Sequence, residues 1–269
     1  MAAILFGAAT LTGCKKDNPN NGNSSNNQWV AETLTFKVND SSDGFIMKKV
    51  EGGDYSMEYM YENQVTTVTG TLSDFYICPV EVTNKLWDAV MGWRPEGQSN
   101  NGDSYPVSNV NYYDIVKEGG FIDKLNTMCA DQLPSGKRFA LPTEAQWEYA
   151  ARGGQKSMGY KYAGSNTIDE VAWYAGNADG TTHPVGLKQP NELGLYDMTG
   201  NVWEWCADWY GEYPAESVTD PTGPQKGSFK LFRGGGWHES ARYCRCAVRG
   251  YSEPDYQDGN FGFRCIIKD

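Results

Sequence analysis

Acidic side chains gather in one stretch of the chain, residues 191–210. This stretch contains four carboxylates, at Glu192, Asp197, Glu204 and Asp208, together with three tryptophans and two glycines. Oxygen ligands of this kind suit a hard cation such as calcium, and the formal net charge of −11 favours calcium or a cationic surface as a partner. The net charge could instead serve only to keep a secreted protein soluble.

Cysteine is the second residue type here with possible chemistry. Cys14 lies in the N-terminal segment, and an even number of further cysteines in an exported protein indicates up to three disulfides. Cys244 and Cys246 are two residues apart, so in a strand they would point to opposite faces, and joint ligation of one ion would require a bulge. The six further cysteines are Cys78, Cys129, Cys206, Cys244, Cys246 and Cys265.

Chemistry based on histidine is not indicated. The two histidines, His183 and His238, are far apart in the sequence, and the Cys244-x-Cys246 pair has no second pair at the spacing of a zinc site. With so few histidines, a Ser-His-Asp catalytic set is not expected either. The acidic balance also argues against nucleic acid as a partner, because binding to phosphates needs clustered lysine and arginine.

The acidic stretch must be positioned by a strand that begins after Gly200. Its side chains alternate, which predicts a core strand that directs a carboxylate to one side and tryptophans to the other. Val202, Glu204 and Cys206 would share one face, and Trp203, Trp205 and Ala207 the other.

The N-terminus predicts export and a lipid anchor. Residues 1–13 are apolar, too short to span a bilayer, and lead to Cys14 in the manner of a bacterial lipoprotein signal whose cysteine is lipidated. Residues 14–33 form an Asn-rich polar run that we expect to be a disordered tether. Residues 34–269 are then one domain, which we place in the bacterial cell envelope, periplasmic or at the cell surface, with the lipid as its membrane contact.

The remaining chain reads as short strands, turns and a few helices. Strands are expected at residues 35–38, 44–50 and 74–80, and Thr83 can cap a helix that runs to Met91. Residues 112–128 have helical spacing with an interruption at Gly119 and Gly120.

The clearest helix lies in residues 141–154, where Thr143 and Gln146 can form a capping box. Trp147 is expected in the core, whereas Glu144 and Glu148 would flank it, either paired with Arg152 or simply on a solvated face. Further on, the glycines at 234–236 indicate a backbone crowded against another group, and residues 261–267 alternate as a core strand.

Several of these segments, in this order, resemble the formylglycine-generating, or sulfatase-modifying factor, family. The resemblance runs from about Gly44 to Lys268 and implies a single irregular α+β domain, low in regular secondary structure and related to C-type lectin folds. The matching segments are EVTN (81–84), PVSNV (106–110), LPTEAQWEYAARGG (141–154), NELGLYDMTGNVWEW (191–205), RGGGW (233–237) and GFR (262–264).

The resemblance implies bound structural calcium. The family's ligands match the side chains of Asp197 and Glu204 and the backbone carbonyls of Gly200 and Val202, which together supply the oxygens that calcium requires. A second, weaker metal position matches Asn177 and Ala178.

The family comparison also bears on the disulfides. Cys129 and Cys265 match a pair that forms a disulfide in the family. Cys246 matches another disulfide position, but its usual partner is Ala151 here, so Cys246 would pair differently or stay free. A pairing of Cys206 with Cys244 or Cys246 is the next expectation.

At the catalytic positions the sequence departs from the family. Active members hold copper(I), a soft ion suited to thiolates, between two cysteines and oxidise a sulfatase cysteine to formylglycine. Here Glu239 occupies the first position and Cys244 the second, while Gly236 replaces a serine. Copper is therefore not expected to bind as in the family, and we predict that Cys244 either forms a disulfide or has no second thiolate within ligand distance.

Two functions remain open. The first is a binding or scaffolding module without oxidase activity, in which a pocket recognises a peptide or a glycan of the cell envelope. The alternative is an active oxidase that converts a sulfatase cysteine to formylglycine. An iron-dependent thiol oxidase would need three histidines and is not expected. The predicted pocket residues are Gly236, Trp237, His238, Glu239 and Arg242.

Overall fold

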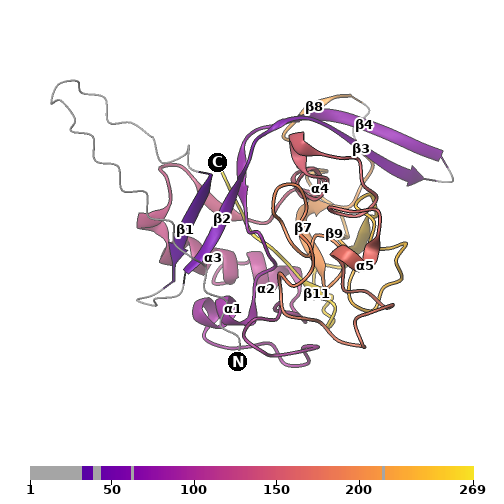
Figure 1. The fold of residues 1–269 in the computed structure, drawn as a ribbon. Coiled ribbons are helices and arrows are strands. Elements are labelled where there is room, and N and C mark those ends of the chain that lie inside the picture. The colour runs from indigo at the N-terminus through magenta and orange to yellow at the C-terminus, as the bar shows by residue number, and fades with distance from the viewer. Residues whose placement is uncertain (1–31, 39–43, 62–63, 214–215) are drawn as a thin grey trace, which may run out of the picture.

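A computed structural model describes residues 32–38, 44–61, 64–213 and 216–269 of the chain (Figure 1). The predicted signal, Cys14 and nearly all of the predicted tether lie outside these residues. The described part mixes short helices with three small sheets, as expected for an irregular α+β domain. None of its helices is long and apolar enough to cross a membrane.

The strand that comes last in the sequence, β12, lies inside the first sheet and not at its edge. The strand order is β1-β2-β5-β12-β6, and every pair is antiparallel. The predicted strands at 35–38 and 44–50 are confirmed within a residue or two, while the one at 74–80 is shorter. The bounds are β1 Thr33–Lys37, β2 Gly44–Val50, β5 Phe75–Ile77, β12 Ile266–Lys268 and β6 Arg138–Ala140.

The second sheet is a long hairpin that extends away from the body of the molecule (Figure 1). It consists of β3 (Gly53–Tyr61) and β4 (Gln64–Leu72), and β8 (Val218–Thr219) pairs parallel to β4. This hairpin was not predicted from the sequence. Tyr55 and Met57 of β3 are buried where its base meets the body.

The third sheet carries the acidic stretch. Its order is β10-β9-β7-β11, in which β11 runs parallel to the central strand β7. The predicted strand at 261–267 is split, because β11 and β12 belong to different sheets and Arg264 between them turns to Glu204. The bounds are β7 Trp203–Trp209, β9 Lys230–Arg233, β10 Gly250–Ser252 and β11 Phe261–Gly262.

The helices begin as the sequence predicts. The Thr83 side chain accepts from Leu86 N at the start of α1, and the predicted helical segment after residue 112 is divided in two. The bounds are α1 Asn84–Met91, α2 Tyr112–Val116, α3 Phe121–Met128, α4 Glu144–Ala151 and α5 Ile168–Val171, with 3₁₀ turns at Ala130–Gln132 and Gly154–Lys156.

Helix α4 is buried on every side. The Thr143–Gln146 capping box is present, and Trp147 is fully buried, as predicted. The expected solvated face is wrong, however, because Glu144 and Glu148 are only 2% and 1% exposed. Arginine side chains from distant strands and loops surround them and make this burial possible.

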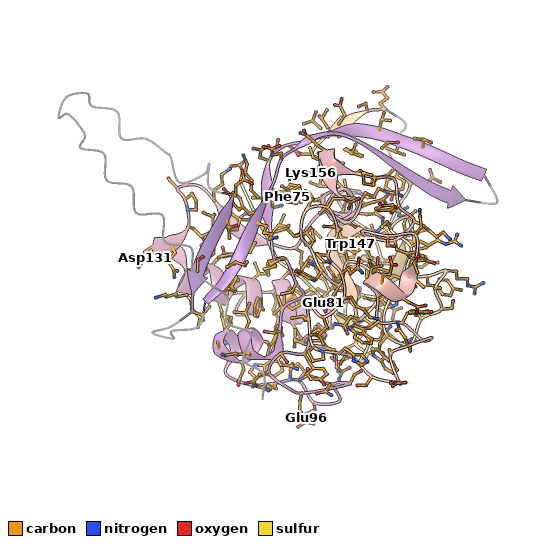
Figure 2. All side chains as sticks on the ribbon, viewed as in Figure 1. Phe75, Glu81, Glu96, Asp131, Trp147 and Lys156 are labelled. Carbon is orange, nitrogen blue, oxygen red and sulfur yellow. The ribbon has the colours of Figure 1, made fainter. Side chains whose placement is uncertain are left out.

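Strand β7 separates two hydrophobic clusters. Trp203 and Trp205 belong to the first cluster and Cys206 to the second, so the predicted alternation is confirmed. The predicted alternation of residues 261–267 is also present, because Phe261, Phe263, Cys265 and Ile267 lie in the first cluster and Ile266 lies in the second. Figure 2 shows Trp147 and Glu81 in the interior of the body, whereas Glu96 lies at its periphery.

Candidate functional site

Three buried carboxylates, Glu81, Asp197 and Glu204, surround one guanidinium, that of Arg264; we refer to these four residues as the carboxylate centre. Glu204 is fully buried on β7. Its Oε1 accepts from Arg264 Nη2 at 2.7 Å, and its Oε2 accepts from Arg264 Nε at 2.7 Å and Trp147 Nε1 at 2.8 Å. This predicted ligand is thus held in a bidentate ion pair, and its orientation is fixed from two sides.

Asp197, the other predicted side-chain ligand, is only partly satisfied. Its backbone has a φ of 55°, and its Oδ2 accepts from Gly186 N at 2.7 Å. Its Oδ1 is buried without a hydrogen-bond partner, and burial raises the pKa of this carboxyl to about 6. A buried acceptor without a donor is costly, which marks this oxygen as a point where a further group can bind.

The backbone that links these two ligands is a tight turn. Gly200 has a φ of 79° and Asn201 one of 61°, and Val202 is fully buried. The turn is fixed from outside by Gly200 N and Asn201 N, which donate to the carbonyls of Gly234 and Trp173. The four predicted calcium ligands thus lie within one segment, residues 197–204, whose turn is held by these two hydrogen bonds.

Glu81 was not predicted as part of this site. It lies in the segment just before α1, and its carboxylate accepts from Val202 N at 3.1 Å and from Asn201 Nδ2 at 2.6 Å. Burial, together with the charge of Asp197, raises the pKa of Glu81 well above its usual range. The family motif at 81–84 singled out this residue, but nothing in its spacing shows that it reaches the turn at 201–202.

The carboxylate centre contains more negative than positive charge. Three carboxylates face one guanidinium in a region that water does not reach, and uncompensated buried charge is strongly unfavourable. Either protons or a cation can supply the missing charge. Within the described residues no three His, Cys, Asp or Glu side chains form a metal cluster, so a cation here would also need backbone oxygens.

The weaker metal position at Asn177 and Ala178 is engaged in local contacts. Asn177 Oδ1 accepts from Tyr174 N at 3.0 Å, and Asn177 Nδ2 lies 3.0 Å from Ala172 O. The Ala178 carbonyl lies 2.9 Å from His183 Nε2. Both oxygens that were predicted as ligands therefore already have partners, and this second site stays a prediction.

The residues predicted to line a pocket lie on the loop after β9. Glu239 Oε1 accepts from Trp203 Nε1 at 3.1 Å and lies 3.4 Å from His238 Nε2. The Glu239 and His238 side chains are 21% and 46% exposed, so both can reach a ligand. Trp237 N donates to Asn201 O at 2.8 Å, which connects this loop to the turn of the carboxylate centre.

The Asn260 side chain fills the space that a side chain at residue 236 would need. A Cβ atom at residue 236 would lie 1.9 Å from Asn260 Oδ1, so no larger residue fits there without movement. Asn260 is fully buried, and both of its amide atoms lack a hydrogen-bond partner. Sequence reasoning missed Asn260, because only the fold places it against the glycines at 234–236.

Arg242 lies at the exposed edge of the pocket loop. Its Nη2 is 2.5 Å from Tyr243 Oη, and its guanidinium lies over the Tyr243 ring. The side chain can therefore meet a ligand at the surface, whereas Gly236 lies in the interior.

Cys244 is a buried thiol rather than a thiolate. Its Sγ lies 3.8 Å from Ser240 O, and Gly235 packs directly against it with a φ of 78°. Burial, with the nearby charge of Glu239, raises the pKa of Cys244 to about 12. Cys246 belongs to a different hydrophobic cluster, so these two cysteines do not share one site.

All six cysteines of the described residues are free thiols, so none of the disulfide predictions is shown and each stays a prediction. Cys129 is not bonded to Cys265, because its Sγ turns to Lys37 O at 3.6 Å at the end of α3. Cys265 instead lies beside Cys78. Cys206 is likewise bonded to neither Cys244 nor Cys246.

A second cluster of buried charges surrounds α4; we call it the α4 ion network. Arg249 binds both oxygens of Glu144, at 2.7 and 2.8 Å, and Arg233 bridges Glu144 and Glu148. Arg152 Nε also binds Glu148, at 2.7 Å. Each of the two carboxylates is thereby paired with two guanidinium groups.

Comparisons with known proteins support the family resemblance of this chain. A family model described as a sulfatase-modifying factor enzyme 1-like domain matches residues 34–269. The chain is 34% identical to the chaperone protein LppX of Paenibacillus barcinonensis over 260 residues, covering 81% of this chain and 87% of LppX. It is 37% identical to the formylglycine-generating enzyme of Streptomyces coelicolor over 204 residues, covering 66% of this chain and 60% of that enzyme.

One solved structure reproduces nearly the whole domain. Treponema denticola variable protein 1 superposes with a TM-score of 0.76 at 31% identity, covering 88% of this chain and 99% of that protein. The predicted fold class is therefore confirmed.

Proposed function

Because this chain belongs to the formylglycine-generating, or sulfatase-modifying factor, family, we propose that it is a binding module without copper oxidase activity. Its target is a peptide or a glycan of the bacterial cell envelope. The observation that carries this proposal is the identity of residue 239, which is a glutamate where the oxidase chemistry needs a thiolate.

The surroundings of Glu239 support the loss of copper binding. Copper(I) is a soft ion that prefers thiolates, and a carboxylate is a hard ligand. Glu239 is also already engaged by Trp203 Nε1 and His238. The remaining cysteine, Cys244, stays protonated at neutral pH because its pKa is about 12.

The same loop offers chemistry for binding. Trp237, His238, Glu239 and Arg242 combine aromatic rings with donors and acceptors of both charges, and the His238 and Glu239 side chains are partly exposed. Such a set can bind the amides of a peptide or the hydroxyls of a glycan. The name of LppX, a chaperone protein, is consistent with a relative that binds other molecules.

Structural calcium is part of the proposal. Asp197, Glu204 and the carbonyls of Gly200 and Val202 would hold the ion, and its charge would offset the excess of carboxylates over Arg264. The unpartnered Oδ1 of Asp197 supports this assignment, as does the presence of Glu81 beside the same turn. Calcium would then act by stabilising the fold beneath the pocket loop.

Attachment to the envelope completes the proposal. Lipidation of Cys14 would anchor the domain through the polar run at residues 14–33. The domain would then reach its target from the periplasmic or the outer surface of the cell.

The alternative is an active formylglycine-generating oxidase, which the 37% identity to a formylglycine-generating enzyme favours. To decide between the two, the purified protein is incubated with a sulfatase-type cysteine peptide, copper, oxygen and a reducing thiol. Mass spectrometry then measures the conversion of the peptide cysteine to an aldehyde. We expect none, and aldehyde formation above the protein-free background would refute the binding-module proposal.

A gain-of-function variant tests whether Glu239 is the reason that the site does not bind copper(I). Glu239→Cys restores a thiol near Cys244 and should increase copper(I) binding, measured by competition with a copper(I) chelator. Glu253→Cys, at an exposed site, controls for the added thiol. The family serine is not restored at Gly236 in this variant, because the serine Cβ would collide with Asn260. Equal copper binding by the two variants would show that residue 239 is not what disables the site.

A further inference from the structure

Cys78 and Cys265 lie directly opposite each other on neighbouring antiparallel segments. Ile77 at the end of β5 pairs with Ile266 at the start of β12, so the next pair outward is Cys78 and Cys265. Cys78 N donates to Cys265 O at 2.9 Å. Opposed residues in such a pair have Cα atoms about 4.5–5.5 Å apart, which lies inside the range found in disulfides.

The two side chains also meet. Both cysteines belong to the first hydrophobic cluster and are almost completely buried, and the neighbouring Cys265 side chain lowers the pKa of the Cys78 thiol. Met47 Sδ lies 3.2 Å from Cys78 Sγ and covers the pair from β2. We propose that Cys78 and Cys265 form a disulfide that joins β5 to β12.

The other cysteines are placed less well for this bond. Cys129 Sγ turns to Lys37 O. Cys206 and Cys246 belong to the second hydrophobic cluster, and Cys244 belongs to a third. Cys265 therefore has one favoured partner, and this partner differs from the one that the family resemblance implies.

The bond forms by exchange with a disulfide oxidant, either a small-molecule disulfide or the active-site disulfide of a thiol oxidoreductase. The thiolate of one cysteine attacks a sulfur of the oxidant, forms a mixed disulfide and releases one thiol. The thiolate of the second cysteine then displaces the other thiol. Two thiols of the protein lose two protons and two electrons, and the oxidant gains them as two thiols.

The cross-link would close a loop of about 190 residues, and long loops give the largest loss of entropy in the unfolded chain. It would tie the central strand of the first sheet to its neighbour. We expect oxidation to raise the thermal midpoint by about 10 °C relative to the reduced protein. This inference is independent of whether the protein binds a ligand or oxidises a peptide.

Peptide mapping tests the proposal directly. The purified protein is unfolded, refolded with reduced and oxidised glutathione, alkylated and digested with trypsin without reduction. We expect the fragment 50–85 to be linked to the fragment 265–268, two hydrogens lighter than the separate peptides. A link between 125–137 and 265–268, or alkylation of both Cys78 and Cys265 after refolding, would overturn it.

Two variants keep the test independent of folding defects. Cys129→Ser should keep both the 78–265 link and the midpoint shift on oxidation, whereas Cys78→Ser should lose both. If Cys78→Ser does not fold, the contrast of wild type with Cys129→Ser still decides. Resistance of Cys78 and Cys265 to alkylation that a copper(I) chelator removes would show a soft-metal site at Met47 and refute the disulfide.

Discussion

The α4 ion network and the carboxylate centre are two buried charge clusters that differ in balance. In the network, Glu144 and Glu148 are each paired with two guanidinium groups, and the oxygens of both carboxylates have donors. In the centre, Glu81, Asp197 and Glu204 share Arg264, and Asp197 Oδ1 has no partner. Every carboxylate oxygen of the first cluster has a donor, although Arg233 Nε has no partner, whereas in the second cluster a carboxylate oxygen is itself left without a donor.

A single tryptophan connects the two clusters. Trp147 on α4 donates from Nε1 to Glu204 of the carboxylate centre, and the Arg233 guanidinium of the network lies over its ring at 5.4 Å. The contrast in charge balance therefore occurs across one side chain in a continuous interior. The α4 ion network stabilises the fold through pairs within the protein, whereas the carboxylate centre is suited to a bound ion.

Removal of Arg233 should give the largest effect on this comparison. Arg233→Met leaves Glu144 and Glu148 without their shared partner, and breaking a buried pair in this way costs about 3–5 kcal/mol. Denaturant unfolding measures the loss in the free energy of unfolding. Arg245→Met, at an exposed position, should change it by less than about 0.5 kcal/mol. A loss below about 1 kcal/mol for Arg233→Met would show that the network is dispensable.

Calcium should stabilise the protein by binding at the carboxylate centre. At a hundredfold excess over its Kd, bound calcium stabilises a native protein by about 2.7 kcal/mol, and we expect this gain relative to EDTA. Asp197→Ala should abolish it, while Asp255→Ala, which removes an exposed carboxylate, should keep it. If unfolding curves of the wild-type protein with calcium and with EDTA coincide, protons rather than calcium compensate the carboxylate centre.

The smallest expected effect concerns Asp208, at the border of the α4 ion network. Its Oδ2 accepts from Glu144 N, and burial, followed by the charge of Glu144, raises its pKa from 3.8 to about 7. The folded state thus holds the proton more tightly than the unfolded state, so this contribution to stability is complete below about pH 4 and is lost as the pH rises through 7.

The Asp208→Asn variant isolates this contribution. Between pH 5 and pH 7 the free energy of unfolding of the wild-type protein should fall by about 2 kcal/mol relative to the variant. Urea unfolding at a series of pH values measures the difference. Parallel pH profiles for the two proteins would mean that Asp208 is already ionised in the folded state at pH 5.

Local features of the fold were predictable from the sequence. The capping box of Thr143 and Gln146 and the alternation after Gly200 depend on neighbouring residues, and both are present. The burial of Glu144 was not predictable, because Arg233 and Arg249 lie about 90 and 100 residues away, and only the fold brings them together. The split of residues 261–267 has the same origin, since Arg264 turns to Glu204.

The candidate sites show the same limit. Asp197, Gly200, Val202 and Glu204 lie within one segment, so the family motif could point to all of them. Glu81 and Asn260 reach their sites from opposite ends of the domain, and neither position is marked by its neighbours. The Cys129–Cys265 prediction has the same limit, because only the fold reveals that Cys78 lies opposite Cys265.

The position of β12 has a consequence for folding during synthesis on the ribosome. Residues 266–268 fill the place between β5 and β6, pairing with residues 77 and 140. The ribosome adds them long after it has made the neighbouring strands, so the first sheet cannot close during most of translation. The hydrogen bonds that join β5 to β6 through β12 can therefore form only after residues 266–268 have been synthesised.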